Sequence, residues 1–103
     1  MELLNARTFT AERPWGAQDV ARLEQASVRL HWTDKAYHWH VNDGTEVFVV
    51  VDGQVDMHVR NDGAENIVRL GAGDVLRVDE GDEHYAQPLG EARILVIERY
   101  GSE

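Results

Sequence analysis

Short runs that alternate apolar and polar side chains dominate this chain from about residue 28 onward. Such alternation is typical of half-buried β-strands, because successive side chains of a strand point to opposite faces. Turn sequences such as Asp52-Gly53 separate the runs at intervals of about 8–12 residues. The pattern favours an all-β antiparallel sandwich or barrel. Strands are expected over residues 28–32, 37–41, 46–51, 55–60, 67–70, 75–78, 84–87 and 93–98.

The length of 103 residues fits a single domain over residues 1–103, with the barrel core expected over 28–98. Residues 1–27 are mixed and polar, with a weak helical spacing between Gln18 and Gln25. This N-terminal segment is expected either to cover the barrel or to be exchanged between the subunits of a dimer. The composition, 43% hydrophobic and 28% charged, is ordinary for a globular protein and argues against disorder.

The acidic charge balance narrows the possible partners. A formal net charge of −9 disfavours binding to nucleic acid or to an anionic membrane surface. The chain has no cysteine, which excludes disulfides, thiolate zinc sites and cysteine nucleophiles. The N-terminus lacks the apolar stretch of a signal peptide, and no run approaches the roughly 20 apolar residues of a membrane span. A cytoplasmic protein is therefore expected.

One expected strand contains a His-x-His pair, and period-two alternation predicts that His38 and His40 share a face. The next strand begins at Glu46. Pairing of the two strands across the intervening turn would place Glu46 beside both histidines. Phe48 and Val50 would then lie deeper on the same inner face.

The opposite face of these two strands would carry five large apolar side chains. Small monomers rarely leave so much contiguous apolar surface in water. Either the N-terminal segment or a second subunit must cover this face, and a homodimer is therefore expected. The five residues are Tyr37, Trp39, Val47, Val49 and Val51.

Two imidazoles that point at one spot can bind a metal ion. Neutral imidazole together with carboxylate suits divalent iron, manganese, nickel or zinc. A carboxylate from the adjacent strand and a third histidine would make four ligands, which leaves two positions of an octahedral ion open for a substrate or dioxygen. The same spacing also suits amphipathic side chains at the rim of a barrel, so spacing alone leaves both interpretations open.

The spacing around these histidines resembles the first motif of the cupin superfamily. That motif has His-x-His, three or four residues, Glu, six residues and Gly. In this chain five residues separate His40 from Glu46, and six more precede Gly53. The additional residue could be absorbed by Asn42-Asp43-Gly44 as a longer turn or bulge. Otherwise Glu46 would face away and only histidines would remain.

The second cupin motif is also matched in spacing and order. It has Gly, five residues, Pro-x-Gly, two residues, His, three residues and Asn. Here Gly73 is followed after five residues by Asp79-Glu80-Gly81, then by His84 and Pro88. Asp79 replaces the proline and Pro88 replaces the asparagine, but neither position holds a ligand in the family pattern.

The resemblance to small single-domain cupins implies a double-stranded β-helix, the cupin or jelly-roll barrel, which is often a homodimer. It implies that His38, His40, Glu46 and His84 bind one divalent transition metal: Fe, Mn, Ni or Zn. Similar small cupins are labelled mannose-6-phosphate isomerase-like or associated with polyketide synthesis. Glu46 is the candidate catalytic base, because a carboxylate beside a metal can exchange ligation for a proton.

Two classes of function follow from these observations. The first is a metalloenzyme that performs dioxygenation, isomerisation or cyclisation on a small organic substrate. The alternative is a non-catalytic module that binds a small molecule or a structural metal, and a barrel without metal is a third possibility. A redox-active ion with open coordination positions would favour catalysis, whereas a fully coordinated zinc would favour a structural role.

The other histidines and several arginines are expected to play lesser roles. His31 and His58 are interpreted as surface or barrel-lining residues rather than metal ligands. Arg29, Arg60 and Arg77 alternate with apolar residues, and the sequence does not place their side chains. An arginine that faced the barrel interior would indicate a carboxylate or phosphate ligand.

Overall fold

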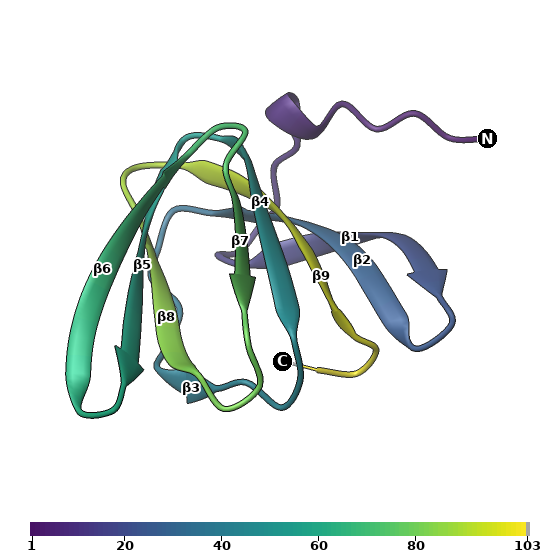
Figure 1. Cartoon of the computed structure of the whole chain (residues 1–103). Helices are drawn as coiled ribbons and strands as arrows, with labels where there is room; N and C mark the ends of the chain where they lie inside the picture. Colours follow the sequence, from purple (N-terminus) through teal and green to yellow (C-terminus); the bar gives the residue numbers. More distant parts are fainter. Residues whose placement is uncertain (103) are drawn as a thin grey trace.

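The computed structural model describes residues 1–102 and consists almost entirely of β-strands (Figure 1). Its one helical turn in that range is a short 3₁₀ helix, η1 (Ala6–Thr8). No helix in the described part of the chain is long and apolar enough to cross a lipid bilayer. The strands are β1 (Gly16–Leu23), β2 (Ala26–Thr33), β3 (His40–Val41), β4 (Glu46–Asp52), β5 (Gln54–Asn61), β6 (Ala64–Gly71), β7 (Val75–Val78), β8 (Glu83–Pro88) and β9 (Ala92–Arg99).

The strands form two antiparallel sheets that face each other (Figure 1). The first sheet has the order β1-β2-β9-β4-β7 and the second has the order β3-β8-β5-β6. β1 pairs with β2 and β5 pairs with β6, but the other consecutive strands cross from one sheet to the other, as β4 and β5 do through a tight turn. This arrangement confirms the predicted all-β jelly-roll, or double-stranded β-helix, fold.

The core lies between the two sheets and is built from the inward-facing residues of each strand. In β4, Phe48 and Val50 are buried together with Glu46, which confirms the shared face predicted from alternation. Burial of one large aliphatic or aromatic side chain contributes about 1.5–3 kcal/mol, so this row of contacts holds the sheets together. The buried apolar cluster comprises Phe48, Val50, Val55, Met57, Leu70, Val78, Ala86, Ala92, Ile94 and Val96.

The tight turn between β4 and β5 depends on Gly53. Its φ of +83° lies in the left-handed region that residues with a side chain rarely adopt. A Cβ on this residue would also collide with the carbonyl oxygen of Glu91 and crowd Ala92, at 3.0 Å from its Cα. The turn between β4 and β5 can therefore pack against the turn before β9 only because position 53 carries no side chain.

Residues 18–25, whose spacing is weakly helical, do not form a helix. Residues Gly16–Leu23 form β1 at the edge of the first sheet, paired with β2 from Gly16 opposite Trp32 to Leu23 opposite Ala26. An isolated, uncapped helix of this length is marginal in water, whereas the strand gains a backbone ladder with β2.

The strand predicted over residues 37–41 begins later than expected. Only His40–Val41 forms a strand, and the preceding residues follow an irregular path in which the Tyr37 amide donates to the Ala86 carbonyl at 3.0 Å. Tyr37 therefore lines an interior pocket, and Trp39 packs against the ring of Tyr85 at 4.6 Å. Neither lies on the expected apolar outer face, which retains the half-buried valines of β4.

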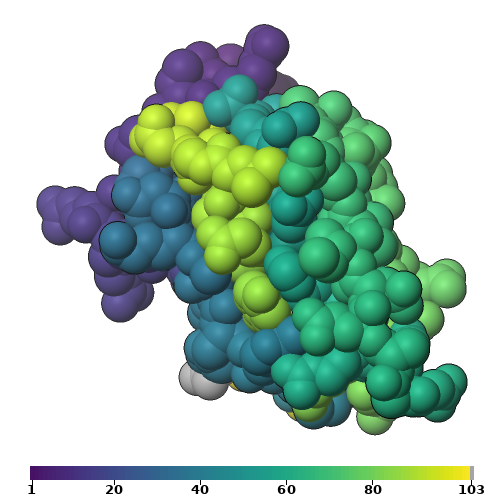
Figure 2. Space-filling view, turned by 90° about the vertical axis from the view of Figure 1, so that its left-hand side faces the viewer, coloured from purple at the N-terminus to yellow at the C-terminus, as the bar shows by residue number. Residues whose placement is uncertain are grey.

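The N-terminal segment lies against the first sheet. Helix η1 contacts β4, and the Arg93 side chain donates a hydrogen bond to the Phe9 carbonyl at 2.8 Å. In the space-filling view the N-terminal residues lie on one side of the molecule, and residues of β5 and β6 lie on the opposite side (Figure 2). Exchange of this segment between two subunits stays a prediction.

The role of Gly53 can be tested with two glycines that share a positive φ. Gly53→Ala is expected to lower the free energy of unfolding by about 1–3 kcal/mol more than Gly63→Ala, because only at position 53 would a Cβ overlap neighbouring atoms. Urea denaturation followed by circular dichroism measures both values. Equal losses would show that the positive φ alone requires glycine.

Candidate metal centre

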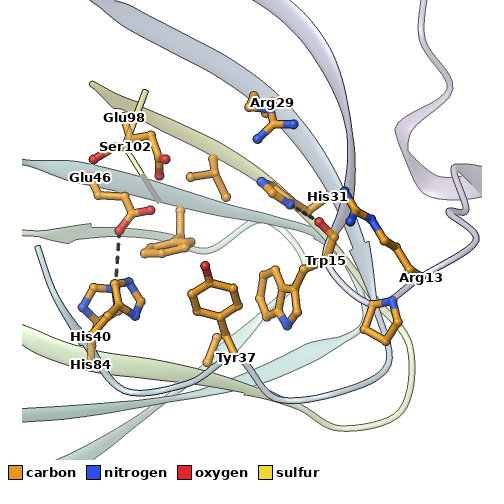
Figure 3. A pocket seen from close by; sticks show the side chains of 14 residues that line it. Arg13, Trp15, Arg29, His31, Tyr37, His40, Glu46, His84, Glu98 and Ser102 are labelled. Carbon is orange, nitrogen blue, oxygen red and sulfur yellow. Dashed lines mark hydrogen bonds and ion pairs between the residues drawn. The ribbon is translucent and has the colours of Figure 1, made fainter. Parts of the chain in front are cut away.

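Three polar side chains converge at one end of the interior: His40, Glu46 and His84. One ligand atom from each lies within 4.8 Å of the others. His40 stands directly opposite His84 in the pairing of β3 with β8, and Glu46 reaches them from β4 in the facing sheet. Glu46 Oε1 lies 3.4 Å from His84 Nε2, as the dashed line in Figure 3 shows. The two sheets thus bring a carboxylate and two imidazoles to one point.

The turn that precedes Glu46 is held against the loop between β7 and β8. The Asn42 amide donates to the Asp82 carbonyl, and the Gly81 amide donates to the Asn42 carbonyl, both at 3.0 Å. The Asn42 side chain donates to the Val78 carbonyl at 3.4 Å. The turn therefore accommodates the additional residue of the first motif, and Glu46 faces inward rather than away.

Three buried atoms of this group have no hydrogen-bond partner among residues 1–102: Glu46 Oε1, His84 Nδ1 and His84 Nε2. Of these, Glu46 Oε1 and His84 Nε2 face each other. Their residues are only 6% and 1% exposed. A buried polar atom that lacks a partner costs about 1–3 kcal/mol, so folded proteins rarely leave two of them facing each other. A divalent cation between the two atoms would satisfy both, and the nitrogen and oxygen donors present fit such an ion.

The protonation of both imidazoles also suits a metal. Burial lowers the pKa of His84 and of His40, which favours the neutral form that metal binding requires. His40 Nδ1 lies 3.0 Å from the His38 carbonyl oxygen. Because a carbonyl only accepts, Nδ1 carries the hydrogen and Nε2 keeps its lone pair. This backbone contact therefore leaves His40 with the correct atom free for ligation.

A second carboxylic acid, Glu98 of β9, lies beside Glu46 and was not identified from the sequence. Burial and a hydrogen bond with Glu46 raise the pKa of Glu98 to about 9, and burial also raises the pKa of Glu46. In this pair the protonated Glu98 carboxyl group donates the hydrogen bond and the Glu46 carboxylate accepts it. One signal was available: Ile94, Val96 and Glu98 follow the period of one strand face, and the first two are core residues.

His38 is not brought into the group. Its side chain is exposed, and its ring stacks on that of Tyr37 at 4.2 Å and lies 5.8 Å from the ring of His40. The cause is local: the strand begins at His40, so the two-residue alternation that was expected to align the histidines does not extend back to His38. The predicted four-ligand set stays a prediction, with three of its members together.

The three residues border a pocket of about 450 Å³, within the usual range of small-molecule sites (Figure 3). Trp15, Tyr37 and Phe48 contribute aromatic surface to its wall. Figure 3 shows the candidate metal ligands and Glu98 on one side of the pocket and a second group of polar residues on the other. That second group consists of Arg13, Arg29 and His31.

The remaining histidines and arginines divide between the pocket and the exterior. His31 lines the pocket, whereas the ring of His58 stacks on Tyr85 with centroids 4.3 Å apart. Of the three arginines that the sequence did not place, Arg29 is the one that lines this pocket.

A family model described as a cupin domain matches residues 29–98. The match covers more than half of the chain and includes both histidine motifs, so the chain belongs to the cupin family. No curated protein matches the chain.

Solved structures share the fold. A cupin-2 domain protein from Shewanella frigidimarina NCIMB 400 has a TM-score of 0.77 and 24% identity, over 86% of this chain and 84% of that one. A cupin superfamily protein from Desulfitobacterium hafniense DCB-2 has a TM-score of 0.79 and 16% identity, over 96% and 90%. Hydroquinone 1,2-dioxygenase PnpCD in complex with Fe³⁺ has a TM-score of 0.78 and 17% identity, over 87% of this chain but only 29% of that one.

A pair of histidine variants tests the ligand group. His40→Ala is expected to weaken binding of Zn²⁺ by about tenfold or more, whereas His38→Ala should have a smaller effect because His38 lies outside the group. Isothermal titration calorimetry on the full chain measures both affinities, and circular dichroism checks that the strands persist. A loss of equal size in both variants would establish His38 as a fourth ligand, and full affinity in His40→Ala would contradict the site.

Proposed function

We propose that this cupin binds one divalent transition metal at His40, Glu46 and His84 and acts on a small organic substrate in the adjoining pocket. The observation that carries the proposal is the pair of buried atoms, Glu46 Oε1 and His84 Nε2, that face each other without hydrogen-bond partners among the described residues. Two imidazoles and a carboxylate suit iron, manganese, nickel or zinc. His38, which the motif would add as a fourth ligand, lies outside this group, and the comparison of His38→Ala with His40→Ala tests whether it binds the ion.

The position of the group beside an open pocket favours catalysis over a structural role. Structural metal sites are usually closed by protein ligands, whereas catalytic sites keep positions open toward a cavity. A bound divalent ion would supply Lewis acidity to a substrate oxygen. The proposed chemistry is dioxygenation, isomerisation or cyclisation. The iron bound by the structurally similar hydroquinone 1,2-dioxygenase supports the first of these by analogy of fold alone.

The chain's own residues have separate roles in this proposal. Glu46 is the proposed ligand and the proposed catalytic base, since it borders both His84 and the pocket. Glu98 is a positioning residue whose hydrogen bond holds the Glu46 carboxyl group. Phe48 and Val96 contribute apolar surface to the pocket beside these groups.

Metal content is the direct test. The untagged chain purified without chelator is expected to contain about one equivalent of iron, manganese, nickel or zinc per chain, because residues 1–102 contain one group of converging ligands. Elemental analysis gives both the quantity and the identity of the metal, and Glu46→Gln should reduce the quantity. Iron would direct assays to dioxygen consumption, and the other metals to isomerase and cyclase assays. A chain that binds none of these ions after reconstitution would contradict the proposal.

We also propose a cytoplasmic homodimer that covers the outer face of the first sheet. The strand register places Leu30, Leu95 and Val49 side by side on that face. Leu95 and Val49 are only half-buried, so a second subunit could bury them further. One chain has a mass of 11.7 kDa. Multi-angle light scattering at micromolar concentration is expected to give twice that mass. A mass of one chain would mean that the N-terminal segment alone covers this face.

A further inference from the structure

The side of the pocket away from the metal ligands is cationic in a strongly acidic protein. Arg13 and Arg29 both line it, although the chain has a formal net charge of −9. Long-range repulsion disfavours the approach of an anion to such a protein, but charges are screened beyond roughly 8 Å at physiological ionic strength. Local cations therefore decide whether an anionic group can bind in this pocket.

Both guanidinium groups retain donors for a ligand. Arg29 uses its Nε to bind Asp19 Oδ1 at 2.7 Å, and its charge also acts on the Glu98 carboxyl group. Among residues 1–102 its two Nη atoms have no hydrogen bond or ion pair. The guanidinium of Arg13 has no hydrogen-bond or ion-pair partner within the same range. By contrast, the exposed Arg77 is paired with Asp79 at 2.9 Å. A planar guanidinium with free donors is well suited to the oxygens of a carboxylate or phosphate.

The wall between the two ends is aromatic, and Trp15 is held there in an uncommon backbone conformation. Its φ of +63° is rare for a bulky residue. Two contacts hold it: the Trp15 carbonyl accepts from His31 Nδ1 at 3.0 Å, and the indole Nε1 donates to the Lys35 carbonyl at 2.9 Å. The indole then meets the Tyr37 ring edge-on at 5.4 Å. Such strain persists where the surrounding structure enforces it, often at ligand sites.

We propose that the ligand of this pocket is a small organic acid with an apolar, preferably aromatic, body. Its carboxylate or phosphate binds Arg13 and Arg29, its body lies along Trp15 and Tyr37, and its other end reaches His40, Glu46 and His84. This assignment rests on the proposed function for its orientation toward the metal, but the anion site itself consists of protein groups alone. Because the metal ligands are acidic or neutral, the acid would bind with its anionic group toward the arginines.

Three probes of similar shape test the charge requirement. Benzoate and phenyl phosphate carry the two candidate anionic groups, and benzyl alcohol is the neutral counterpart. Isothermal titration calorimetry with the full chain, as purified and after metal removal, is expected to show that at least one anion binds about tenfold or more tightly than the alcohol. The stronger anion identifies the group that the arginines accept. Equal affinity for all three probes, or no binding of either anion, would overturn the proposal.

Substitutions then assign the binding to the two arginines. Arg13→Gln together with Arg29→Gln is expected to weaken anion binding about tenfold or more, whereas the matched control Arg77→Gln, which removes a charge outside the pocket, should leave it unchanged. Arg13→Gln alone provides a second test if loss of the Asp19 contact unfolds the double variant. Unchanged anion affinity in the folded variants would refute the assignment.

Metal content separates this proposal from the proposed function. Anion binding that depends on the arginines in a chain unable to bind metal would overturn the metal function and support the anion site. A chain that binds metal but neither anion would support the metal function and overturn the anion site.

Discussion

In a pair of facing sheets, only every second side chain of a strand points into the interior. The rest of this structure depends on that constraint. The inward row of β4 runs Glu46, Phe48, Val50, and the inward row of its neighbour β9 runs Ile94, Val96, Glu98. Because β4 and β9 are antiparallel, the polar end of one row lies beside the polar end of the other. The interior is therefore apolar along most of its length and ionisable at one end.

At that polar end, ionisable groups are buried away from water. Taking carboxyl and imidazole groups out of water favours their neutral forms, which explains the raised pKa of Glu98, about 9, and the lowered pKa of His84. A protein gains nothing in stability from such a cluster, because apolar side chains of similar volume would pack at lower cost. The facing atoms of Glu46 and His84 are best explained as a site for a cation.

Strands that are alternating or β-branched apolar runs between turn sequences were predictable. The runs expected at 46–51, 55–60 and 93–98 lie within one or two residues of β4, β5 and β9. The edge strand β1 was missed because its side chains are mostly exposed and alternate weakly, so its structure comes from pairing with β2. His38 was placed by extending an alternation that the two-residue strand β3 is too short to support.

The sequence by itself determined the class of fold and the order of His40, Glu46 and His84, because strand period and motif spacing are local properties that a linear pattern records. Only the tertiary structure decided what surrounds them. Glu98 joins Glu46 across neighbouring strands, and Arg13 from the N-terminal segment lines the same pocket as Arg29 of β2. These residues are distant in the chain, and their meeting depends on how the sheets pair and pack, which no local pattern specifies.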